Sequence, residues 1–298
     1  MRTLILGEAL VDLVCETPVT SLAQARAFVP RFGGAMANVA VVAARAGADV
    51  ALAGGAGDDA WGGWLRDRLA DEGVALDWFA LVDAPTPVAF VTVDPQGEPT
   101  FRLYAEGVGT ALEALGHLGV DGAVDACDAL CFASNTLVGA RERTLTLAAR
   151  ERALAHDKPV VFDPNLRLHR WDSPERAAEV ARECVPGAFL VKANAQEARL
   201  LTGEADPARA AAGLLAAGAR NVVITLGAGG ALLRGEGLSR DVPGVPADVV
   251  DTTGAGDTLL GVLVGALSES AYYGPTLAAA LPDAVVAGAR ATERWGAH

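Results

Sequence analysis

Short apolar stretches that suit buried strands alternate with helix-length segments along most of this 298-residue chain. A strand pattern at Thr3 to Leu6 is followed by a glycine-opened helical pattern at Ala35 to Ala46 and by a second strand pattern at Val50 to Ala53. Such alternation predicts an α/β fold, in which helices cover both faces of a largely parallel sheet. Because ligands of such folds lie at the carboxyl ends of the strands, residues that follow strands are the first candidates for a functional site.

The same alternation continues through the second half of the chain. Helical patterns are expected at residues 61–72, 141–156, 174–184, 195–201 and 207–217, and strand patterns at 129–132, 160–162, 189–191 and 222–226. A hairpin near 231–242 and two C-terminal helices complete the prediction.

One hairpin interrupts the alternation. Val88 to Val93 and Thr100 to Leu103 are rich in β-forming residues, and a turn containing Pro and Gly separates them. We expect residues 1–298 to form a single domain. About residues 9–15 and 86–105 would contribute a small sheet that serves as a lid over its site. Because exposed strand edges tend to be covered, this lid also predicts a homodimer.

Composition excludes several classes of function. The formal net charge of −13 and a pI near 4.7 disfavour binding to nucleic acid. No apolar run reaches the roughly 18 residues that span a bilayer, and the N-terminus lacks the pattern of a signal peptide, so we expect no membrane partner and a cytoplasmic location. The cysteines lack close pairs and the histidines lie far apart, which predicts buried free thiols rather than zinc or disulfides: Cys15, Cys127, Cys131 and Cys184.

The segment Asp251 to Gly261, DTTGAGDTLLG, places a Gly-Ala-Gly turn and a carboxylate in front of an apolar helical run. Gly254, Ala255 and Gly256 would present backbone N–H groups that can hold an anion at the positive end of a helix. Asp257 beside them could accept a proton. The turn alone is equally consistent with a structural first-turn acid that interacts with the helix dipole.

Four further motifs lie where a strand ends or a helix begins. Gly33 to Asn38 (GGAMAN) opens a helix and lets a ligand approach the backbone. Asp163 to Arg167 (DPNLR) follows a strand, Asn194 to Glu197 (NAQE) opens a helix, and Thr225 to Gly230 (TLGAGG) ends another strand. The NAQE segment also fits a capping box, which is a structural pattern.

In this order the motifs resemble those of PfkB-type, ribokinase-like carbohydrate kinases, over essentially the full chain. GGAMAN resembles the N-terminal glycine signature of that family, and DTTGAGDTLLG resembles its C-terminal signature almost residue for residue. NAQE matches its N-x-x-E motif, and TLGAGG matches its nucleotide-binding turn. The resemblance implies a ribokinase-like fold and ATP-dependent phosphorylation of a hydroxymethyl group on a small sugar.

The resemblance also implies roles for single residues. Asp257 would accept the hydroxyl proton while the amides of Gly254, Ala255 and Gly256 stabilise the transferring phosphoryl group. Glu197 would hold Mg²⁺ through water. The implied substrate ligands are Asp12, Gly33, Gly34, Asn38, Asn165 and Arg167, and the implied nucleotide ligands are Asn194, Thr225, Gly227 and Gly230.

Simpler interpretations stay open for some of these residues. Asp12 could be a solvent-facing strand residue, and Asn165 with Arg167 could be a turn Asn and a surface Arg. In several relatives K⁺ lies beside the anion-binding turn, and the residues matching Asp251 and Thr253 contribute to its site. The resemblance therefore implies a K⁺ site here, with its remaining ligands unassigned.

GEALVDL near the start and DPNLR in mid-chain look most like fructokinases and 2-keto-3-deoxygluconate kinases, and we expect fructose first. A sugar acid needs a positive partner, which Arg102 or Arg167 could supply. The segment 104–109, YAEGVG, departs from the fructokinase pattern. A nucleoside kinase ranks third because aromatic residues make up only 5% of the chain. A non-catalytic sugar-binding module is disfavoured by the intact Asp257 and its turn.

Overall fold

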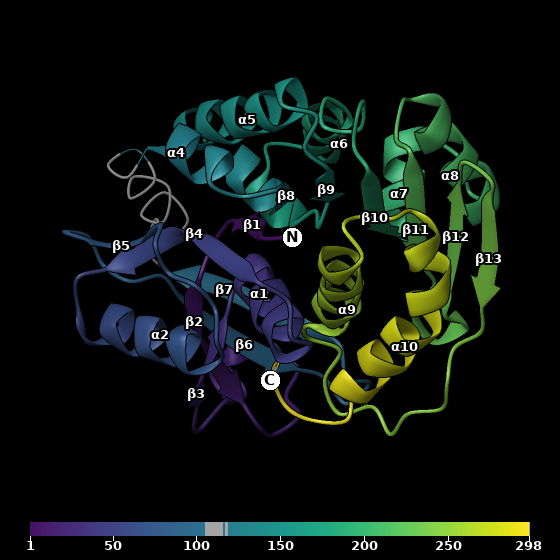
Figure 1. The fold of residues 1–298 in the computed structure, drawn as a ribbon. Coiled ribbons are helices and arrows are strands. Elements are labelled where there is room, and N and C mark those ends of the chain that lie inside the picture. Colours follow the sequence, from purple (N-terminus) through teal and green to yellow (C-terminus); the bar gives the residue numbers. More distant parts are fainter. Residues whose placement is uncertain (105–115, 117–118, 298) are drawn as a thin grey trace.

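A computed structural model describes residues 1–104, 116 and 119–297 (Figure 1). The helices are α1 (Ala35–Arg45), α2 (Ala60–Asp71), α4 (Val120–Asp125), α5 (Ala140–Ala155), α6 (Pro174–Arg182), α7 (Ala195–Thr202), α8 (Pro207–Ala216), α9 (Ala255–Glu269) and α10 (Pro275–Ala291). The strands are β1 (Thr3–Leu6), β2 (Leu10–Cys15), β3 (Val29–Gly33), β4 (Val50–Gly57), β5 (Phe79–Val82), β6 (Val88–Val93), β7 (Pro99–Tyr104), β8 (Ala129–Ala133), β9 (Val160–Asp163), β10 (Leu190–Asn194), β11 (Asn221–Thr225), β12 (Ala231–Gly235) and β13 (Leu238–Val242).

Nine of these strands form one large sheet in the order β13-β12-β11-β10-β9-β8-β1-β4-β5. Pairing is parallel from β11 to β5, and the β12–β13 hairpin adds two antiparallel strands at one edge. Strands such as β1 and β9 are buried along their whole length, as expected of parallel strands covered on both faces. The predicted α/β fold is therefore confirmed, with element ends shifted by a few residues.

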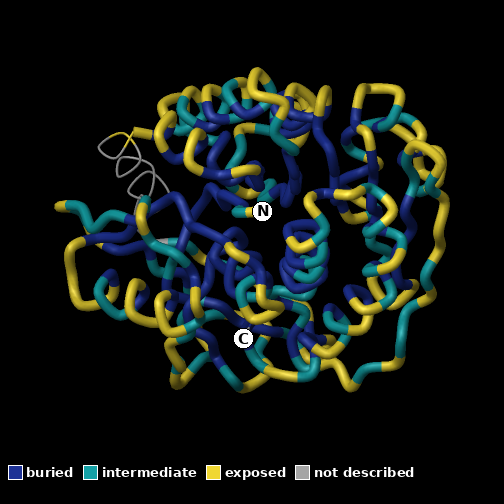
Figure 2. The backbone as a smooth tube through the Cα atoms, in the orientation of Figure 1, coloured by how far each residue is buried: buried dark blue, intermediate teal, exposed yellow. Residues whose placement is uncertain are grey.

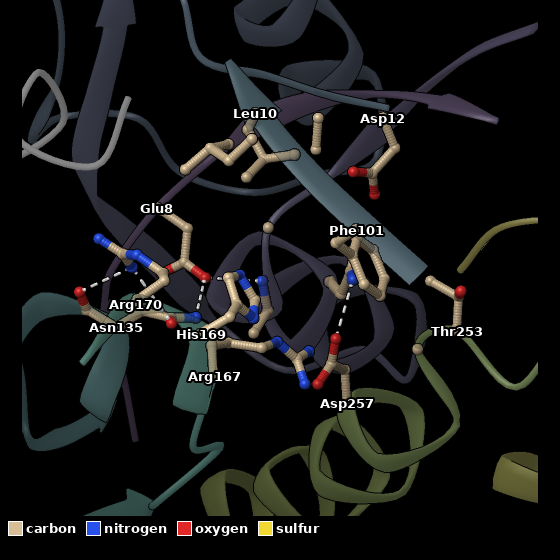
Figure 3. Close-up of a pocket in the computed structure, with 16 residues that line it drawn as sticks. Glu8, Leu10, Asp12, Phe101, Asn135, Arg167, His169, Arg170, Thr253 and Asp257 are labelled. Atoms are coloured by element: carbon tan, nitrogen blue, oxygen red, sulfur yellow. Dashed lines mark hydrogen bonds between the residues drawn. The ribbon is translucent and has the colours of Figure 1, made fainter. Parts of the chain in front are cut away.

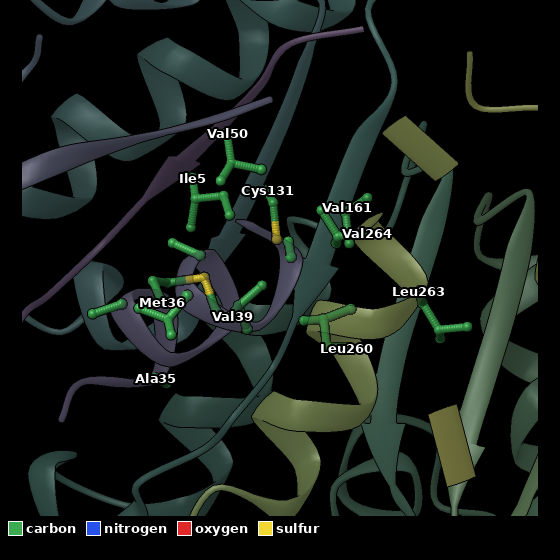
Figure 4. Close-up of a cluster of buried hydrophobic side chains, with 14 of the residues drawn as sticks. Ile5, Ala35, Met36, Val39, Val50, Cys131, Val161, Leu260, Leu263 and Val264 are labelled. Carbon is green, nitrogen blue, oxygen red and sulfur yellow. The ribbon is translucent and has the colours of Figure 1, made fainter. Parts of the chain in front are cut away.

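Two apolar clusters lie on opposite faces of the large sheet. One joins α1, α9 and α10 to the sheet, and part of it is drawn in Figure 4, where Met36 and Val39 of α1 lie near Leu260 of α9. The other joins α4 to α8 to the sheet. In Figure 2 the buried strands run between helices whose outer surfaces are exposed. This covering leaves the carboxyl ends of the strands as the open edge of the sheet.

The small sheet has the order β3-β2-β6-β7. The predicted hairpin β6–β7 is antiparallel, and β2 pairs with β6 in parallel, so the segments around 9–15 and 86–105 do share a sheet. Sequence analysis predicted no strand at β3, which pairs antiparallel with β2. Helix α1 correspondingly starts at Ala35, with Gly34 as its N-cap.

The structure bears on some of the other expectations and leaves the rest as predictions. The four cysteines are free and buried, as predicted. Within the described residues, each helix is too short or too polar to cross a membrane. All but the first residue of the YAEGVG segment lies outside the described part of the chain. The single-domain boundary, the lid role of the small sheet and the homodimer stay predictions.

Candidate active site

Two adjoining cavities open at the carboxyl ends of the strands, between the large sheet and the small sheet. The smaller holds about 80 Å³ and is drawn in Figure 3, and the larger holds about 700 Å³. The residues that line both cavities are Phe101, Arg167, His169, Thr253, Gly254 and Asp257. The cavities therefore meet at the start of α9, where sequence analysis placed the anion-binding turn.

Asp257 stands in the first turn of α9 and is 5% exposed. Its Oδ2 accepts a hydrogen bond of 2.9 Å from Asn38 Nδ2, and its Oδ1 accepts one of 3.2 Å from Asn165 Nδ2. Burial raises the pKa of Asp257 above its ordinary value, while the Arg167 guanidinium and the Asn38 amide act against that rise. The carboxylate is thus fixed between the two cavities and held more basic than a free aspartate.

Asn165 is held by an unusual backbone turn. Its φ is +37°, which non-glycine residues rarely adopt. Asp163 Oδ1 accepts the N–H of Asn165 at 3.1 Å and braces this turn. Asn165 Oδ1 is buried and has no partner among the described residues. The DPNLR segment therefore aims one amide at Asp257 and is not an ordinary surface turn.

Asp12 lies on the cavity face of the small sheet, in one row with Ala89 and Leu103 of the neighbouring strands. It is 5% exposed, so the solvent-facing interpretation is wrong. Its Oδ1 is buried without a partner in the described part of the chain, and burial raises its pKa to about 7. A Cβ on Gly33 would lie 2.0 Å from Asp12 Oδ2. Gly33 lines neither cavity and instead makes room for this carboxylate.

Gly34 and Asn38 do line the small cavity. Gly34 has φ +101°, and a Cβ there would lie 2.4 Å from the carbonyl oxygen of Glu8. Only glycine allows so close an approach at this backbone conformation. The glycine signature thus brings the start of α1 against Glu8, in the segment between β1 and β2.

Three polar residues of the small cavity, the buried Glu8 and Asn135 and the half-buried Arg170, were missed in the sequence. Glu8 Oε1 accepts hydrogen bonds from Ala35 N at 3.0 Å and from Asn135 Nδ2 at 2.8 Å. Arg170 Nη1 donates to both Asn135 O and Asn135 Oδ1. Glu8 Oε2 is buried and unpartnered within the described residues. Glu8 and Asn135 are 127 positions apart, so no local pattern joined them; the polar Glu8 within an apolar run was the one available signal.

Arg167 lines both cavities, and its guanidinium lies 5.6 Å from the centre of the Phe101 ring. His169 lines both as well, and burial, Arg167, Arg170 and Arg102 lower its pKa below the ordinary value. The Arg167 guanidinium, placed over the Phe101 ring, suits the binding of an anionic group where the two cavities meet. Arg167 is therefore placed for a phosphoryl group or for a substrate carboxylate.

The large cavity is lined by Asn194 and Thr225, the last residues of β10 and β11, and by Glu197 in the first turn of α7. The capping box is present, because Asn194 Oδ1 accepts from Glu197 N at 2.8 Å and Glu197 Oε2 accepts from Asn194 N at 2.9 Å. Glu197 Oε1 accepts from Leu166 N at 2.8 Å, which ties α7 to the DPNLR turn. Within the described residues no cluster of three ligating side chains could hold a metal directly.

Gly227 and Gly230 line neither cavity. They bracket a 3-10 turn after β11 with φ of +57° and +93°. A Cβ on Gly230 would lie 2.1 Å from the carbonyl oxygen of Val242. These glycines shape the turn beside Thr225, which faces the cavity.

A buried ion pair beside the large cavity, which Lys192 lines, was also missed. Lys192, in β10, forms a buried ion pair with Asp163, in β9, with Nζ 2.9 Å from Oδ2. The side chains are 5% and 0% exposed. A lysine in the middle of an apolar strand pattern was the sequence signal for this pair.

Asp251 is completely buried below the anion-binding turn. Its Oδ1 accepts from Thr253 N and its Oδ2 from Gly296 N, both at 2.8 Å. Gly254 has φ +75°, and a Cβ there would lie 2.4 Å from that of Ala297. The C-terminal segment therefore packs under the turn and holds it in place. Gly254 and Gly256 line the large cavity; Ala255 forms the turn between them without lining either cavity.

The arrangement can bring two ligands together at one carboxylate. A small polyhydroxy ligand fits the acceptors of the small cavity, and a long anionic ligand fits the large cavity and its amide turn. Asp257 between them could take a proton from the first ligand as the second reacts.

Comparisons with known proteins agree with this arrangement. The model of the pfkB family carbohydrate kinases matches residues 2–298. Fructokinase-2 of Zea mays is 34% identical over 261 residues, which cover 87% of this chain and 77% of that protein.

Two solved structures are similar over nearly the whole chain. Fructokinase with bound ATP from Xylella fastidiosa has a TM-score of 0.85 at 28% identity and covers 99% of this chain and 93% of its own. A fructokinase double mutant from Vibrio cholerae O395, in a form with fructose, ADP and potassium ion bound, has a TM-score of 0.84 at 29% identity with the same coverage. With the family match across the chain, these findings confirm the expected ribokinase-like fold. The chain belongs to the pfkB family of carbohydrate kinases and is a sugar kinase.

Proposed function

We propose that this protein transfers the γ-phosphoryl group of ATP to a hydroxymethyl group of fructose. The observation that carries the proposal is the meeting of the two cavities at Asp257 and Gly254. The sugar would occupy the small cavity and ATP the large one, so that the acceptor hydroxyl and the terminal phosphate face each other there.

Asp257 would act as the general base. The sugar oxygen forms a bond to the γ-phosphorus, the bond from that phosphorus to the bridging oxygen of ADP breaks, and the hydroxyl proton passes to Asp257. The raised pKa of Asp257 favours this transfer. The N–H groups of Gly254, Ala255 and Gly256 would stabilise charge on the phosphoryl oxygens. Asn38 and Asn165 hold the carboxylate for the reaction.

The remaining predicted ligands divide between the two cavities. Asp12, whose Oδ1 has no partner within the described part of the chain, and Gly34 at the helix start would bind the sugar hydroxyls. Asn194 and Thr225 would bind the nucleotide, with Gly227 and Gly230 shaping its turn. Arg167 would contact the phosphoryl group or the sugar from the wall common to both.

Fructose is favoured by the relatives that are fructokinases and by the one whose structure holds fructose. A second candidate is a 2-keto-3-deoxy sugar acid, because Arg167 lines both cavities and Arg102 lines the large one. Two carboxylate oxygens that have no partner among the described residues, on Glu8 and Asp12, favour a ligand that donates hydrogen bonds and therefore the neutral sugar.

Mg²⁺ and K⁺ are proposed as ions of this reaction. Glu197 lines the large cavity with both oxygens already accepting backbone N–H groups, which fits contact to Mg²⁺ through water. Bound there with ATP, the ion would neutralise charge on the phosphates. Asp251 and the buried Thr253 Oγ1, which has no partner in the residues that the structure describes, fit a K⁺ site beside the turn. One similar fructokinase structure contains a potassium ion.

The small sheet is proposed as a lid, because its inner face contributes Asp12, Ala89 and Leu103 to the sugar cavity. Its edge strands β3 and β7 could pair with a second copy to form a homodimer. Light scattering of the purified protein tests the dimer. Location in the cytoplasm stays a prediction.

A kinase assay tests the proposal. ADP release is measured with ATP and Mg²⁺ on fructose, 2-keto-3-deoxygluconate, ribose, tagatose and adenosine, with and without K⁺. We expect the highest kcat/KM with fructose and stimulation by K⁺. A higher kcat/KM with 2-keto-3-deoxygluconate would replace fructose by the sugar acid. Sugar binding without ADP release on any compound would indicate a binding module instead.

A further inference from the structure

Lys192 is the feature of the site that the proposed mechanism does not use. The chain contains only two lysines, Lys158 and Lys192. Lys192 is 4% exposed and forms the buried ion pair with Asp163 described above. Because a buried ion pair is often no more stabilising than two apolar residues of the same size, fold stability alone does not account for it.

The amine of Lys192 lies at the reacting end of the large cavity. Lys192 lines that cavity, and a Cβ on Gly256 would lie 2.9 Å from Nζ. The ammonium group therefore stands against the turn whose amides face the phosphoryl group, one residue before Asp257. Among the described residues Nζ donates one hydrogen bond, to Asp163 Oδ2, although an ammonium group has three donors.

Lys192 remains positively charged in this position. Burial lowers the pKa of the amine, but the carboxylates of Asp163, Glu197 and Asp257 outweigh burial and raise the pKa above its ordinary value. A fixed cation next to preorganised amides is the kind of group that stabilises charge on a transferring phosphoryl group.

The same pair is connected to the proposed base. Asp163 accepts Lys192 Nζ with one oxygen and the N–H of Asn165 with the other. Asn165 in turn donates its side-chain amide to Asp257. Two roles are therefore conceivable for Lys192: contact with the phosphoryl group, or only neutralisation of Asp163 so that Asn165 stays in place.

We propose that Lys192 is a further catalytic residue that donates a hydrogen bond from Nζ to an oxygen of the γ-phosphoryl group of ATP. The inference rests on the proposed function. As the sugar oxygen bonds to phosphorus and the bond to ADP breaks, Lys192 keeps all its protons, and the hydroxyl proton goes to Asp257. Asp163 positions the amine and the turn of Asn165.

The double variant Asp163→Asn/Lys192→Met separates the two roles. Asn at 163 retains an oxygen for the N–H of Asn165, and Met at 192 replaces the amine by an apolar chain of similar length, so neither member of the ion pair is left as a lone buried charge. We expect kcat to fall by about 10²- to 10³-fold, with the KM for the sugar and the melting temperature close to wild type. A folded double variant with wild-type kcat would overturn the proposal, because Lys192 would then only neutralise Asp163.

Calorimetric titration in the absence of sugar gives a second readout. ADP lacks the γ-phosphate, so the double variant should lose affinity for ATP by about tenfold more than for ADP. Equal losses for the two nucleotides would contradict the proposed contact. This measurement stays informative even if wild-type protein phosphorylates none of the sugars, a result that would instead refute the proposed function.

Lys158→Met is the matched control. Lys158 Nζ donates to the backbone carbonyls of Val124, Asp125 and Cys127 and lines neither cavity. We expect this variant to melt at a lower temperature with unchanged kcat. A comparable loss of kcat in Lys158→Met would attribute the effect to general destabilisation and would also overturn the proposal.

Discussion

The two cavities are built in different ways although they share one wall. The small cavity is enclosed by residues of the small sheet, of α1 and α9, and of the segments that follow β8 and β9. Its carboxylates Glu8 and Asp12 each keep an oxygen without a partner in the described residues. The large cavity is bordered by residues 98–102 at the start of β7, by the segment 165–169, by the ends of β10 and β11 with the start of α7, and by the backbone turn before α9. The small cavity therefore presents two carboxylate oxygens that have no partner among the described residues, whereas the charged groups of the large cavity, Lys192 and Glu197, are held by an ion pair and by backbone N–H groups.

This difference suggests that sugar recognition, nucleotide binding and turnover depend on separate residues. A change confined to the small cavity should alter the KM for the sugar, and one confined to the large cavity should alter the KM for ATP. A change at the common wall should alter kcat. Each prediction below tests this separation.

The largest effect is expected at the common wall. Asp257→Asn keeps the shape of the side chain and removes the base, so kcat should fall by about 10²- to 10⁴-fold. The dissociation constants of fructose and of a non-hydrolysable ATP analogue should stay near wild type. Steady-state kinetics and calorimetry provide these values, with the exposed Asp67→Asn as control. Near-normal kcat would remove Asp257 from the mechanism.

Asp12→Asn probes the small cavity alone. The variant replaces a charged acceptor by a neutral amide, so the KM for fructose should rise by about 10- to 100-fold while the KM for ATP stays unchanged. Initial rates at varied concentrations of each substrate distinguish the two constants. Equal increases in both would mean that the cavities do not act separately.

Thr225→Val is the corresponding change in the large cavity. Loss of one neutral hydroxyl should raise the KM for ATP by about two- to tenfold and leave the KM for fructose unchanged. The same two-substrate kinetics measure it. A shift in the KM for fructose of similar size would argue against nucleotide binding at the end of β11.

The smallest effect concerns stability. Burial raises the pKa of Asp12 from 3.8 to about 7, although the nearby Arg167 acts to lower it. The folded state therefore binds a proton at Asp12 more tightly than the unfolded state does. The contribution of Asp12 to the free energy of unfolding therefore falls as pH rises from about 4 to about 7. Asp12→Asn should melt a few °C above wild type at pH 8, a difference that shrinks towards pH 4. Calorimetric melting at several pH values checks this, and a difference independent of pH would contradict it.

Much of the fold could be predicted because parallel strands buried on both faces must be apolar throughout. β1, β8 and β9 stand out for that reason. β3 could not be predicted, since Val29-Pro30-Arg31-Phe32-Gly33 lacks apolar alternation and is an edge strand with only its last two residues buried. Its existence depends on pairing with β2.

In the site, too, features set by local sequence could be predicted, whereas features that depend on distant parts of the chain could not. The turn at 254–257 and the capping box at Asn194 are local, so their residue pattern carries the signal. The partners of Asp257 are not local: Asn38 is 219 positions away and Asn165 is 92. Glu8 and Lys192 likewise gain their contacts only when the sheet forms. Long-range polar pairs in the cavities therefore required the structure.

The most direct test of the central claim, that sugar and nucleotide lie end to end at Asp257, is the affinity of a bisubstrate ligand. In this ligand the hydroxymethyl oxygen of fructose is joined to the terminal phosphate of an adenosine oligophosphate. Calorimetry should show binding at least about 100-fold tighter than that of the ATP analogue, because one molecule fills both cavities. Binding no tighter than that of the nucleotide alone would contradict the account.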